Sequence, residues 1–246
     1  NLISNFNRVE EGKFIENNEE LIKIGNEMFD EFVKYKTIKS IKLFVDICAA
    51  PGNYSEILLD KFPESYGIGI SLPEEKGGVP FEIKSKNYKI FKKDILEKEY
   101  KLEIPRKLDF GMASCVSYVD DPKNAAKLNM ELILTSLKLI LKNLNKDGHL
   151  IINLTFKNIT FIYNLINILS TYFQDFYLWK SENVWATKNT FYFFGYNYKN
   201  NYDNKIESIC NIDRCSDRFI GNQKDFSRIS IKLKPVLITK INSILN

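Results

Sequence analysis

The chain has 246 residues, of which 44% are hydrophobic and 13% aromatic, and its 35 Lys and Arg residues outnumber its 31 Asp and Glu residues by four. Disordered chains combine low hydrophobicity with high net charge, so this composition predicts a folded protein with a sizeable core. The length fits one large domain or two small ones. The small positive charge permits a nucleic-acid partner without requiring one.

The cysteine content indicates the compartment. Four cysteines in a chain of this length are too few and too scattered for the disulfide framework of a small secreted protein, so we predict an intracellular, reducing environment. Cytoplasm, nucleus, mitochondrion and viral factory are not distinguished. No apolar run reaches the roughly 18 to 20 residues of a membrane span, and no cleavable leader opens the chain. We therefore expect no membrane partner, although Asn1 as first residue leaves room for upstream segments.

Hydrophobic periodicity predicts an alternating order of helices and strands. Apolar residues at steps of three and four favour a docking helix over Glu16–Tyr35, and the apolar run Ile41–Ile47 favours a buried strand. A turn of small residues and a helix over Asn53–Phe62 follow. We expect further strands at Tyr66–Ile70, Tyr88–Phe91, Leu108–Ala113, His149–Leu154, Phe176–Trp179 and Phe191–Tyr196, and further helices at Ala125–Leu144 and Phe161–Tyr172.

This alternation is typical of an α/β fold with a mainly parallel sheet covered by helices on both faces. Residues 72–86 contain two prolines and two glycines and are expected to form a loop. The segment after Asn197 is polar up to Gly221 and then apolar and basic, interrupted by Pro235. We expect an N-terminal helical extension over 1–40, one domain over 41–198, and a C-terminal tail over 199–246 that packs on the same domain.

One motif follows the first strand, and it reads Asp46-Ile47-Cys48-Ala49-Ala50-Pro51-Gly52-Asn53-Tyr54-Ser55-Glu56. Ligands of open parallel sheets bind beyond the carboxyl ends of the strands, where small residues let the backbone come close. The N-terminus of the next helix offers free N–H groups and a partial positive charge, which suit a carboxylate. An ordinary strand-to-helix turn also uses glycine and proline, and is the alternative interpretation.

The motif is very similar to the first motif of the FtsJ-like ribose 2′-O-methyltransferases. The segment Gly67–Pro73, with Gly77 and Gly78 after it, resembles a subset of this family from fungal and viral proteins, and Lys93-Asp94-Ile95 resembles the third motif. The resemblance runs in element order from about Leu21 to Tyr198 and is specific over residues 44–94. It implies a Rossmann-like class I methyltransferase fold with a mainly parallel, seven-stranded sheet.

The resemblance also implies S-adenosylmethionine as cofactor. Asp94 would face its adenine, and Asp46 with the turn after it would contact its methionine part. The acid that usually holds the ribose hydroxyls is missing after the second strand, and Ser71 or Glu74 is the expected substitute. The turn residues that the resemblance assigns to the cofactor are Cys48, Ala49, Ala50, Pro51, Gly52 and Asn53.

The family transfers the methyl group with a Lys-Asp-Lys-Glu tetrad, in which a lysine of lowered pKa helps to deprotonate the ribose 2′-hydroxyl. At the matching positions, the first lysine is Lys23, and Lys34 is the alternative. Either could instead be an ordinary solvated lysine on the face of a helix. The aspartate position holds Ser114, the second lysine position Asn153, and the glutamate position Thr190. Three of the four positions have therefore lost their charge.

Neighbouring residues offer other alignments of the tetrad: Cys115 or Asn189 could take the adjacent positions, and Asp109, Asp120 or Lys157 could supply the missing charges. The bland expectation for Cys115 is a small core cysteine, and for His149 a packed strand residue. Cys210 and Cys215 are spaced like zinc ligands, but a structural site needs four ligands and His149 is the only histidine. We therefore expect no metal.

Basic and aromatic residues suggest where RNA could bind. Lys84, Lys86 and Lys89 precede or flank Tyr88 and Phe91, and Lys92 and Lys93 continue the series. Such a pattern is typical of phosphate contacts combined with base stacking, and equally of a solvated face. Trp179 and Trp185 flank a loop that could contact a partner.

Two functions follow. The first is a methyltransferase that acts on the ribose of cap or ribosomal RNA, and the intact first motif favours it. The alternative is a catalytically inactive methyltransferase-like domain that binds RNA or other subunits of an RNA-processing, ribosomal or viral complex, and the altered tetrad favours it. A small-molecule methyltransferase with rebuilt chemistry is a third, weaker interpretation.

Overall fold

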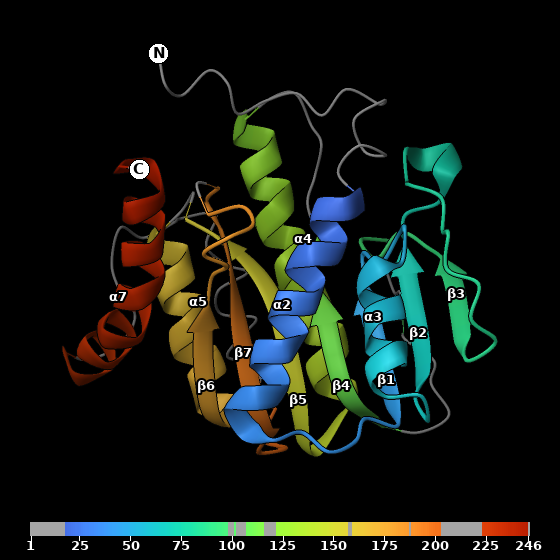
Figure 1. Ribbon diagram of the computed structural model, residues 1–246, viewed down its shortest axis with the longest axis horizontal. Helices are drawn as coiled ribbons and strands as arrows, with labels where there is room; N and C mark the ends of the chain where they lie inside the picture. The colour runs from blue at the N-terminus through green and yellow to red at the C-terminus, as the bar shows by residue number, and fades with distance from the viewer. Residues whose placement is uncertain are drawn as a thin grey trace.

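A computed structural model describes residues 18–97, 101, 107–115, 122–156, 159–186, 188–202 and 223–245. Seven strands form one sheet in the order β3-β2-β1-β4-β5-β7-β6, with helices on both faces (Figure 1). This arrangement confirms the predicted α/β class and the seven-stranded, mostly parallel sheet. None of the helices in the described ranges is both long and apolar enough to cross a bilayer.

Six of the seven strands run in the same direction, and only β7 runs the other way. β7 lies antiparallel between β5 and β6, so the carboxyl ends of β1, β2, β4 and β5 meet at one edge of the sheet. Parallel strands are buried on both faces and need nearly continuous apolar sequence, as the first strand has. The strands are β1 (Leu43–Ile47), β2 (Tyr66–Ser71), β3 (Tyr88–Lys92), β4 (Leu108–Ala113), β5 (Leu144–Thr155), β6 (Phe173–Trp179) and β7 (Thr190–Tyr198).

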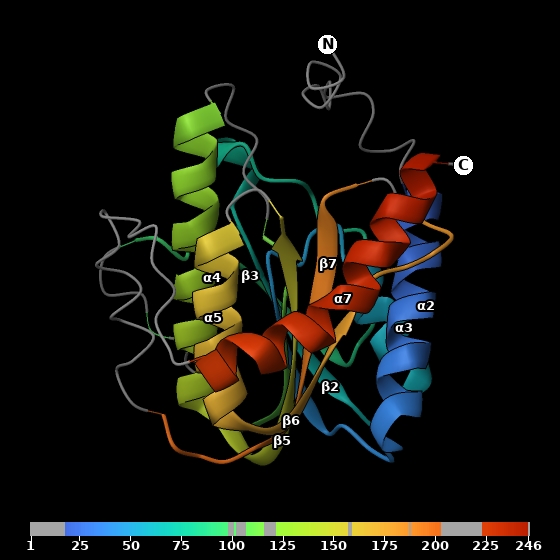
Figure 2. The same ribbon diagram turned by 90° about the vertical axis from the view of Figure 1, so that its left-hand side faces the viewer.

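Two hydrophobic clusters hold the helices against the sheet. On one face, α2 and α3 pack over Phe44 and Phe110; on the other, α4, α5 and α7 pack over Val45 and Ile152. The two layers stand on opposite sides of the sheet in Figure 2, with α7 crossing near β6. The helices are α2 (Asn18–Lys36), α3 (Asn53–Lys61), α4 (Pro122–Asn143), α5 (Ile159–Tyr172) and α7 (Gln223–Leu245), and a short 3-10 helix, η2, spans Glu74–Lys76.

The C-terminal helix differs from the expected interrupted segment, because Pro235 lies inside α7. Proline removes a backbone donor and disturbs the preceding turn, so it usually ends or kinks a helix. Here Ile229, Leu233 and Val236 follow helical spacing and are at most 2% exposed, so their packing favours a continuous helix. The ribbon of α7 changes direction along its length (Figure 2).

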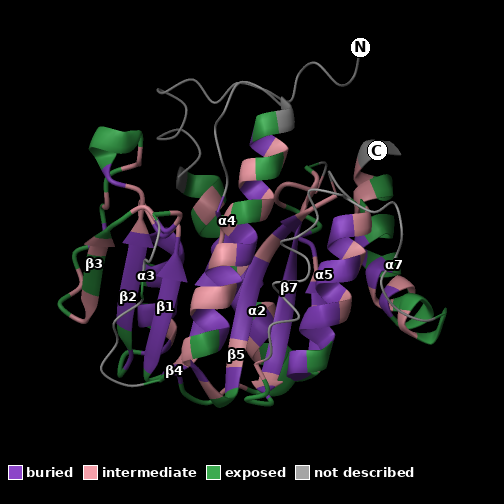
Figure 3. Cartoon of the chain, turned by 180° about the vertical axis from the view of Figure 1, so that it is seen from behind, coloured by how far each residue is buried: buried purple, intermediate pink, exposed green. Residues whose placement is uncertain are grey.

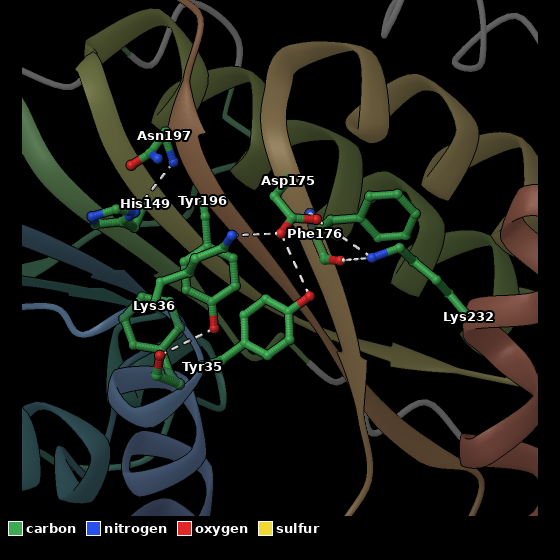
Figure 4. A network of polar contacts seen from close by, with 9 residues as sticks. Tyr35, Lys36, His149, Asp175, Phe176, Tyr196, Asn197 and Lys232 are labelled. Atoms are coloured by element: carbon green, nitrogen blue, oxygen red, sulfur yellow. Dashed lines mark hydrogen bonds and ion pairs between the residues drawn. The ribbon is translucent and has the colours of Figure 1, made fainter.

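Polar contacts join α2 and α7 to the edge strand β6. The Asp175 carboxylate lies 2.8 Å from the Lys36 ammonium and 3.4 Å from that of Lys232 (Figure 4). Lys232 also donates to the Phe176 carbonyl, and the Tyr35 hydroxyl lies 3.5 Å from the same carboxylate. These groups are partly exposed, so each pair contributes little, but together they fix how both helices meet the sheet.

His149 is the packed strand residue that the sequence predicted. Its Nδ1 accepts a hydrogen bond of 3.3 Å from the Asn197 N–H (Figure 4), and its ring meets the rings of Phe32 and Tyr196 edge-on. Burial lowers the pKa of His149 to about 4 and outweighs the attraction of nearby carboxylates. The imidazole is therefore neutral and structural, and it faces no cavity of the site described below.

Candidate functional site

A cavity of about 700 Å³ opens at the carboxyl ends of the parallel strands. Volumes of this size are usual for sites that bind small molecules and cofactors. The turns after β1, β2 and β3 line one part, and the ends of β4 and β5 with the loop before β7 line the other. The predicted site residues that line it are Asp46, Cys48, Ala49, Ala50, Pro51, Asn53, Ser71, Asp94, Ser114, Asn153 and Thr190.

The turn after β1 has a backbone that glycine alone accommodates well. Gly52 has a φ of +115°, and a Cβ on it would come within 2.9 Å of the Ile83 side chain. The N–H groups of Cys48 and Ala49 both donate to the Ile70 carbonyl, at 2.7 and 3.1 Å. Gly52 thus shapes the turn from behind, and β2 holds the turn against the cavity.

Asp46 is a buried carboxyl at the floor of the cavity, only 1% exposed. Ser55 donates a hydrogen bond of 2.8 Å to it, and the Ser55 hydroxyl is also 2.8 Å from that of Tyr88. Burial raises the pKa of Asp46 to about 7, against the opposing effect of the Ser55 hydrogen bond. No Lys or Arg in the described ranges forms an ion pair with it. A cationic ligand group in the cavity would therefore find a carboxylate that still needs a partner.

Asp94 also lines the cavity, from the turn that follows β3. Its carboxylate accepts a hydrogen bond of 2.9 Å from the Leu96 N–H, in a turn directly after β3. Of the two residues expected to replace the missing ribose-binding acid, Ser71 lines the cavity. Glu74 is instead paired with Lys92 at 2.6 Å on the surface and is not part of the lining.

The three neutral tetrad positions lie together in the other half of the cavity. Sheet register explains this, because Ser114 directly follows Ala113, which is paired with Ile152, and Thr190 is paired with Thr155 at the end of β5. Asn153 lies between these pairs. The Ser114 hydroxyl is buried and has no hydrogen-bond partner among the described residues. Buried hydroxyls are normally paired, so this one is available to a ligand.

Lys23 is not in this group. It is exposed on α2 and lies outside the cavity lining, to which α2 contributes Leu21. Residues two apart on a helix point in nearly opposite directions, so Leu21 and Lys23 cannot both face the cavity. Lys34, the alternative, is also exposed and outside the lining. The lysines that do line the cavity are Lys76, Lys93 and Lys188.

The other charged alternatives do not supply the missing groups. Asp109 accepts hydrogen bonds of 3.0 Å from the N–H groups of Lys42 and Leu43, and of 3.1 Å from the Asn145 amide. It lies at the start of β4, at the edge of the sheet opposite the cavity, and is structural. Cys115 is buried and Asn189 lies outside the lining. Asp120, Lys157, Cys210 and Cys215 lie outside the described residues.

The sequence interpretation missed that Cys48 and Cys115 are joined by a disulfide, with their Cα atoms 5.1 Å apart. Each follows a strand end, and β1 and β4 are parallel neighbours in which Ile47 is paired with Ala113. The pairing could not be read from the chain, because spacing along the sequence does not reveal which strands are adjacent. The bond ties the turn of the first motif to the residue after Ser114.

A loop between β6 and β7, which we call the rim loop (residues 180–186 and 188–189), closes one side of the cavity. Lys180 is only 6% exposed, and its ammonium donates bonds of 2.9 Å to the carbonyls of Trp185, Lys188 and Thr190. Burial, and then the charge of Lys240, lowers the pKa of Lys180 to about 8. The sequence singled out Trp185 but gave no signal for Lys180 or Lys188, whose roles depend on how the loop folds.

The basic residues proposed for RNA lie at the far edge of the sheet from the rim loop. Lys84, Lys86 and Lys89 are exposed, and the Lys89 ammonium lies 4.8 Å from the centroid of the Phe91 ring. β3 is an edge strand with exposed and half-buried residues, unlike the buried strands beside it (Figure 3). Lysines on such an edge also prevent pairing with other chains, so an RNA contact here stays a prediction.

Comparisons with known proteins agree with the fold. The model of the FtsJ-like methyltransferase family matches residues 26–198. No curated protein sequence matches the chain. A protein assigned as a ribosomal RNA methyltransferase from Plasmodium falciparum is similar in structure, with a TM-score of 0.53 at 16% identity over 71% of this chain and 96% of that one.

The N-methyltransferase NodS from Bradyrhizobium japonicum WM9, in complex with S-adenosyl-L-homocysteine, has a TM-score of 0.50 at 14% identity over 74% of this chain and 90% of that one. At such low identity these two structures show the class I Rossmann-like methyltransferase fold and nothing finer. The family match is more informative, because it covers well over half of the sequence. The chain therefore belongs to the FtsJ-like family of S-adenosylmethionine-dependent methyltransferases.

Proposed function

We propose that this domain binds S-adenosylmethionine at the carboxyl end of β1 and acts on a ribose 2′-hydroxyl of RNA, in a cap or in ribosomal RNA. The observation that carries the proposal is that one cavity contains most of the residues that the resemblance assigns to the cofactor and three of the four tetrad positions. The similar structure from Plasmodium falciparum, assigned as a ribosomal RNA methyltransferase, supports an RNA substrate.

The residues of the cavity fit the cofactor. Asp46 would hold its ammonium group, Asp94 would face the adenine, and the turn around Gly52 would let the backbone approach the ligand between them. When bound, the cofactor supplies an electrophilic methyl group on a sulfonium. The buried Ser114 hydroxyl, which lacks a partner among the described residues, can orient the ribose hydroxyl by a hydrogen bond.

The proton of that hydroxyl is the difficulty for catalysis. A serine, an amide and a threonine stand at the tetrad positions Ser114, Asn153 and Thr190, and none of these groups accepts a proton at neutral pH. A missing general base typically costs about 100-fold to 10,000-fold in rate. Methyl transfer by this domain alone is therefore expected to be slow at best.

As a second candidate function we propose that the domain binds the cofactor and RNA without catalysing methylation, as a part of a larger RNA-processing, ribosomal or viral complex. The observation that favours it is that all three neutral residues lie inside the cavity, so the loss of charge affects the site itself. Because the cavity is otherwise intact, binding and catalysis make separate predictions.

Two measurements on the full chain separate these functions. Isothermal titration with S-adenosylmethionine should give saturable heat, and radiolabelled methyl transfer to a mixture of capped and uncapped RNAs should then be measured with the same protein. Binding together with transfer supports the methyltransferase, and binding without transfer supports the second function. No heat at millimolar cofactor, with a protein whose circular dichroism shows it to be folded, would overturn both.

A further inference from the structure

We propose that the indole of Trp185 is a stacking platform for an RNA base and that Lys188 holds the neighbouring phosphate. The inference rests on the proposed function, because the base would belong to the RNA whose ribose enters the cavity. Both residues line the cavity next to Thr190, in the half that contains the neutral tetrad positions. It adds a substrate subsite outside the first motif and the tetrad.

The indole of Trp185 is partly exposed and has no aromatic ring packed on it among the described residues. Trp179, the other tryptophan, instead stacks on Phe194 with centroids 6.0 Å apart. Part of the large aromatic surface of Trp185 therefore lines the cavity without a ring packed on it, and a flat ligand in the cavity can cover it. Bases of single-stranded RNA provide flat surfaces of the matching kind.

One hydrogen bond holds the indole of Trp185, and two more hold its backbone carbonyl. Its Nε1–H donates a bond of 2.7 Å to the Glu20 carboxylate on α2, and the Trp185 carbonyl accepts from the Lys180 ammonium at 2.9 Å and from the Lys188 N–H at 3.0 Å. The backbone of Trp185 has a φ of +54°, a left-handed conformation that costs energy for a residue with a large side chain. Such conformations persist where surrounding contacts impose them, and they cluster at sites that clamp ligands.

The rim loop is also attached to α2 at a second point. Ser181 donates a hydrogen bond to the Glu27 carboxylate, and the Asn183 amide donates another of 3.2 Å to it. Glu20 and Glu27 are seven residues apart and therefore lie on the same face of the helix, two turns from each other. The rim loop is thus held at two points along α2, which reduces the entropy that would be lost on ordering it around a ligand.

Lys188 supplies a positive charge beside the indole, which can bind the phosphate of the nucleotide. Its side chain is exposed, its ammonium lies 5.3 Å from the centroid of the Trp185 ring, and it forms no ion pair with a carboxylate of the described residues. In the free protein the ammonium covers the indole. When a nucleotide binds, the Lys188 ammonium moves from the indole to the phosphate, and the base stacks on the indole in its place.

Tryptophan fluorescence tests this directly, because the chain has two tryptophans. In a Trp179→Phe variant the emission comes from Trp185 alone. A short single-stranded RNA oligonucleotide should quench it saturably, and ribose 5-phosphate, which has the anion without the ring, should not. Equal quenching by both probes, or none by the RNA, would overturn the inference. Calorimetric titration of the cofactor on the same variant reports separately on the proposed function.

Substitutions separate the two parts of the subsite. Measured by anisotropy with labelled RNA, Trp185→Ala should weaken binding about tenfold, and Trp185→Phe should recover part of it. Lys188→Gln should expose the indole to acrylamide, weaken RNA binding, and reduce the salt slope by about 0.7, the value for one phosphate of a single strand. Lys146→Gln is the matched control, because Lys146 is exposed near the start of β5, at the end of the strand away from the cavity. Identical effects of the two lysine variants would contradict the phosphate contact.

Discussion

Replacing Asp46 by Asn should stabilise the protein in the absence of cofactor, and increasingly so as the pH rises. The carboxyl has an ordinary pKa of 3.8, which burial raises to about 7. Between these two values the folded protein keeps a proton that the unfolded chain has released, so the free energy of unfolding falls as the pH rises. Above about pH 7 the folded state holds an ionised, buried carboxylate and the whole penalty is present.

The magnitude follows from the difference of about 3 between the two pKa values. At 1.36 kcal/mol for each unit, the penalty above pH 7 is about 4 kcal/mol, and about 2 kcal/mol of it is already present near pH 5. An isosteric Asn removes it while still accepting the Ser55 hydrogen bond. The extra gain of about 2 kcal/mol near pH 8 should appear as a rise in Tm that is larger by about 5 °C than the rise near pH 5.

Thermal unfolding followed by circular dichroism at the two pH values measures this difference. Ser55→Ala is the matched variant, because it removes the one side-chain hydrogen bond that favours the ionised form of Asp46. Its destabilisation should therefore be greater at the higher pH, the reverse of the Asp46→Asn effect. A difference between Asp46→Asn and the wild type that stays constant across the pH range would refute the reasoning.

Three further predictions concern ligands. Cofactor affinity should increase as the pH rises through about 7, because the ionised form of Asp46 attracts an ammonium group. Below that pH, calorimetry in buffers of different ionisation enthalpy should detect a proton that Asp46 releases when the cofactor binds. Wild-type protein should show little ribose methylation in a radiolabel assay. The triple variant S114D/N153K/T190E should have a higher rate, whereas each single substitution should not, because such groups act as a unit. Removing the charges at the β3 edge should weaken RNA binding and flatten its salt dependence in a filter assay, and unchanged values would assign them to edge protection; these lysines are Lys84, Lys86 and Lys89.

Local patterns predicted the elements that position the site. The stripe on α2 and the apolar run of β1 were found with their ends within about two residues, because burial on one face or on both imposes a clear period. The strand β5 begins five residues before the expected His149, since Leu144 is paired with Leu108 before a bulge. Asp147, with a φ of +65°, turns the backbone there. Such irregular pairing leaves no periodic signal.

The part of the cavity proposed for the cofactor was predictable, because a single short segment, residues 46–55, supplies much of its lining. The substrate half was only partly predictable, since its residues come from β4, β5 and the rim loop. Ser114 and Asn153, which the resemblance singled out, line the cavity, whereas Lys23 does not, because its side of α2 is exposed. The disulfide of Cys48 depends on which strands are neighbours, and the burial of Lys180 depends on how the rim loop folds, so the sequence alone predicted neither.

The position of β7 between β5 and β6 has a consequence for how the chain folds. Of the described strands, β6 is paired with β7 alone, so it leaves the ribosome before its partner has been synthesised. The edge of β5 that pairs with β7 is unpaired during the same interval. Residues 46–96, which line the part of the cavity proposed for the cofactor, emerge much earlier. Strand pairings that close late are slow to form and expose apolar edges meanwhile. A nascent chain released before Thr190 would contain the turn after β1 but not the Thr190 carbonyl that helps to hold Lys180 in the rim loop. Its strands β5 and β6 would lack their partner β7 and could pair with another chain.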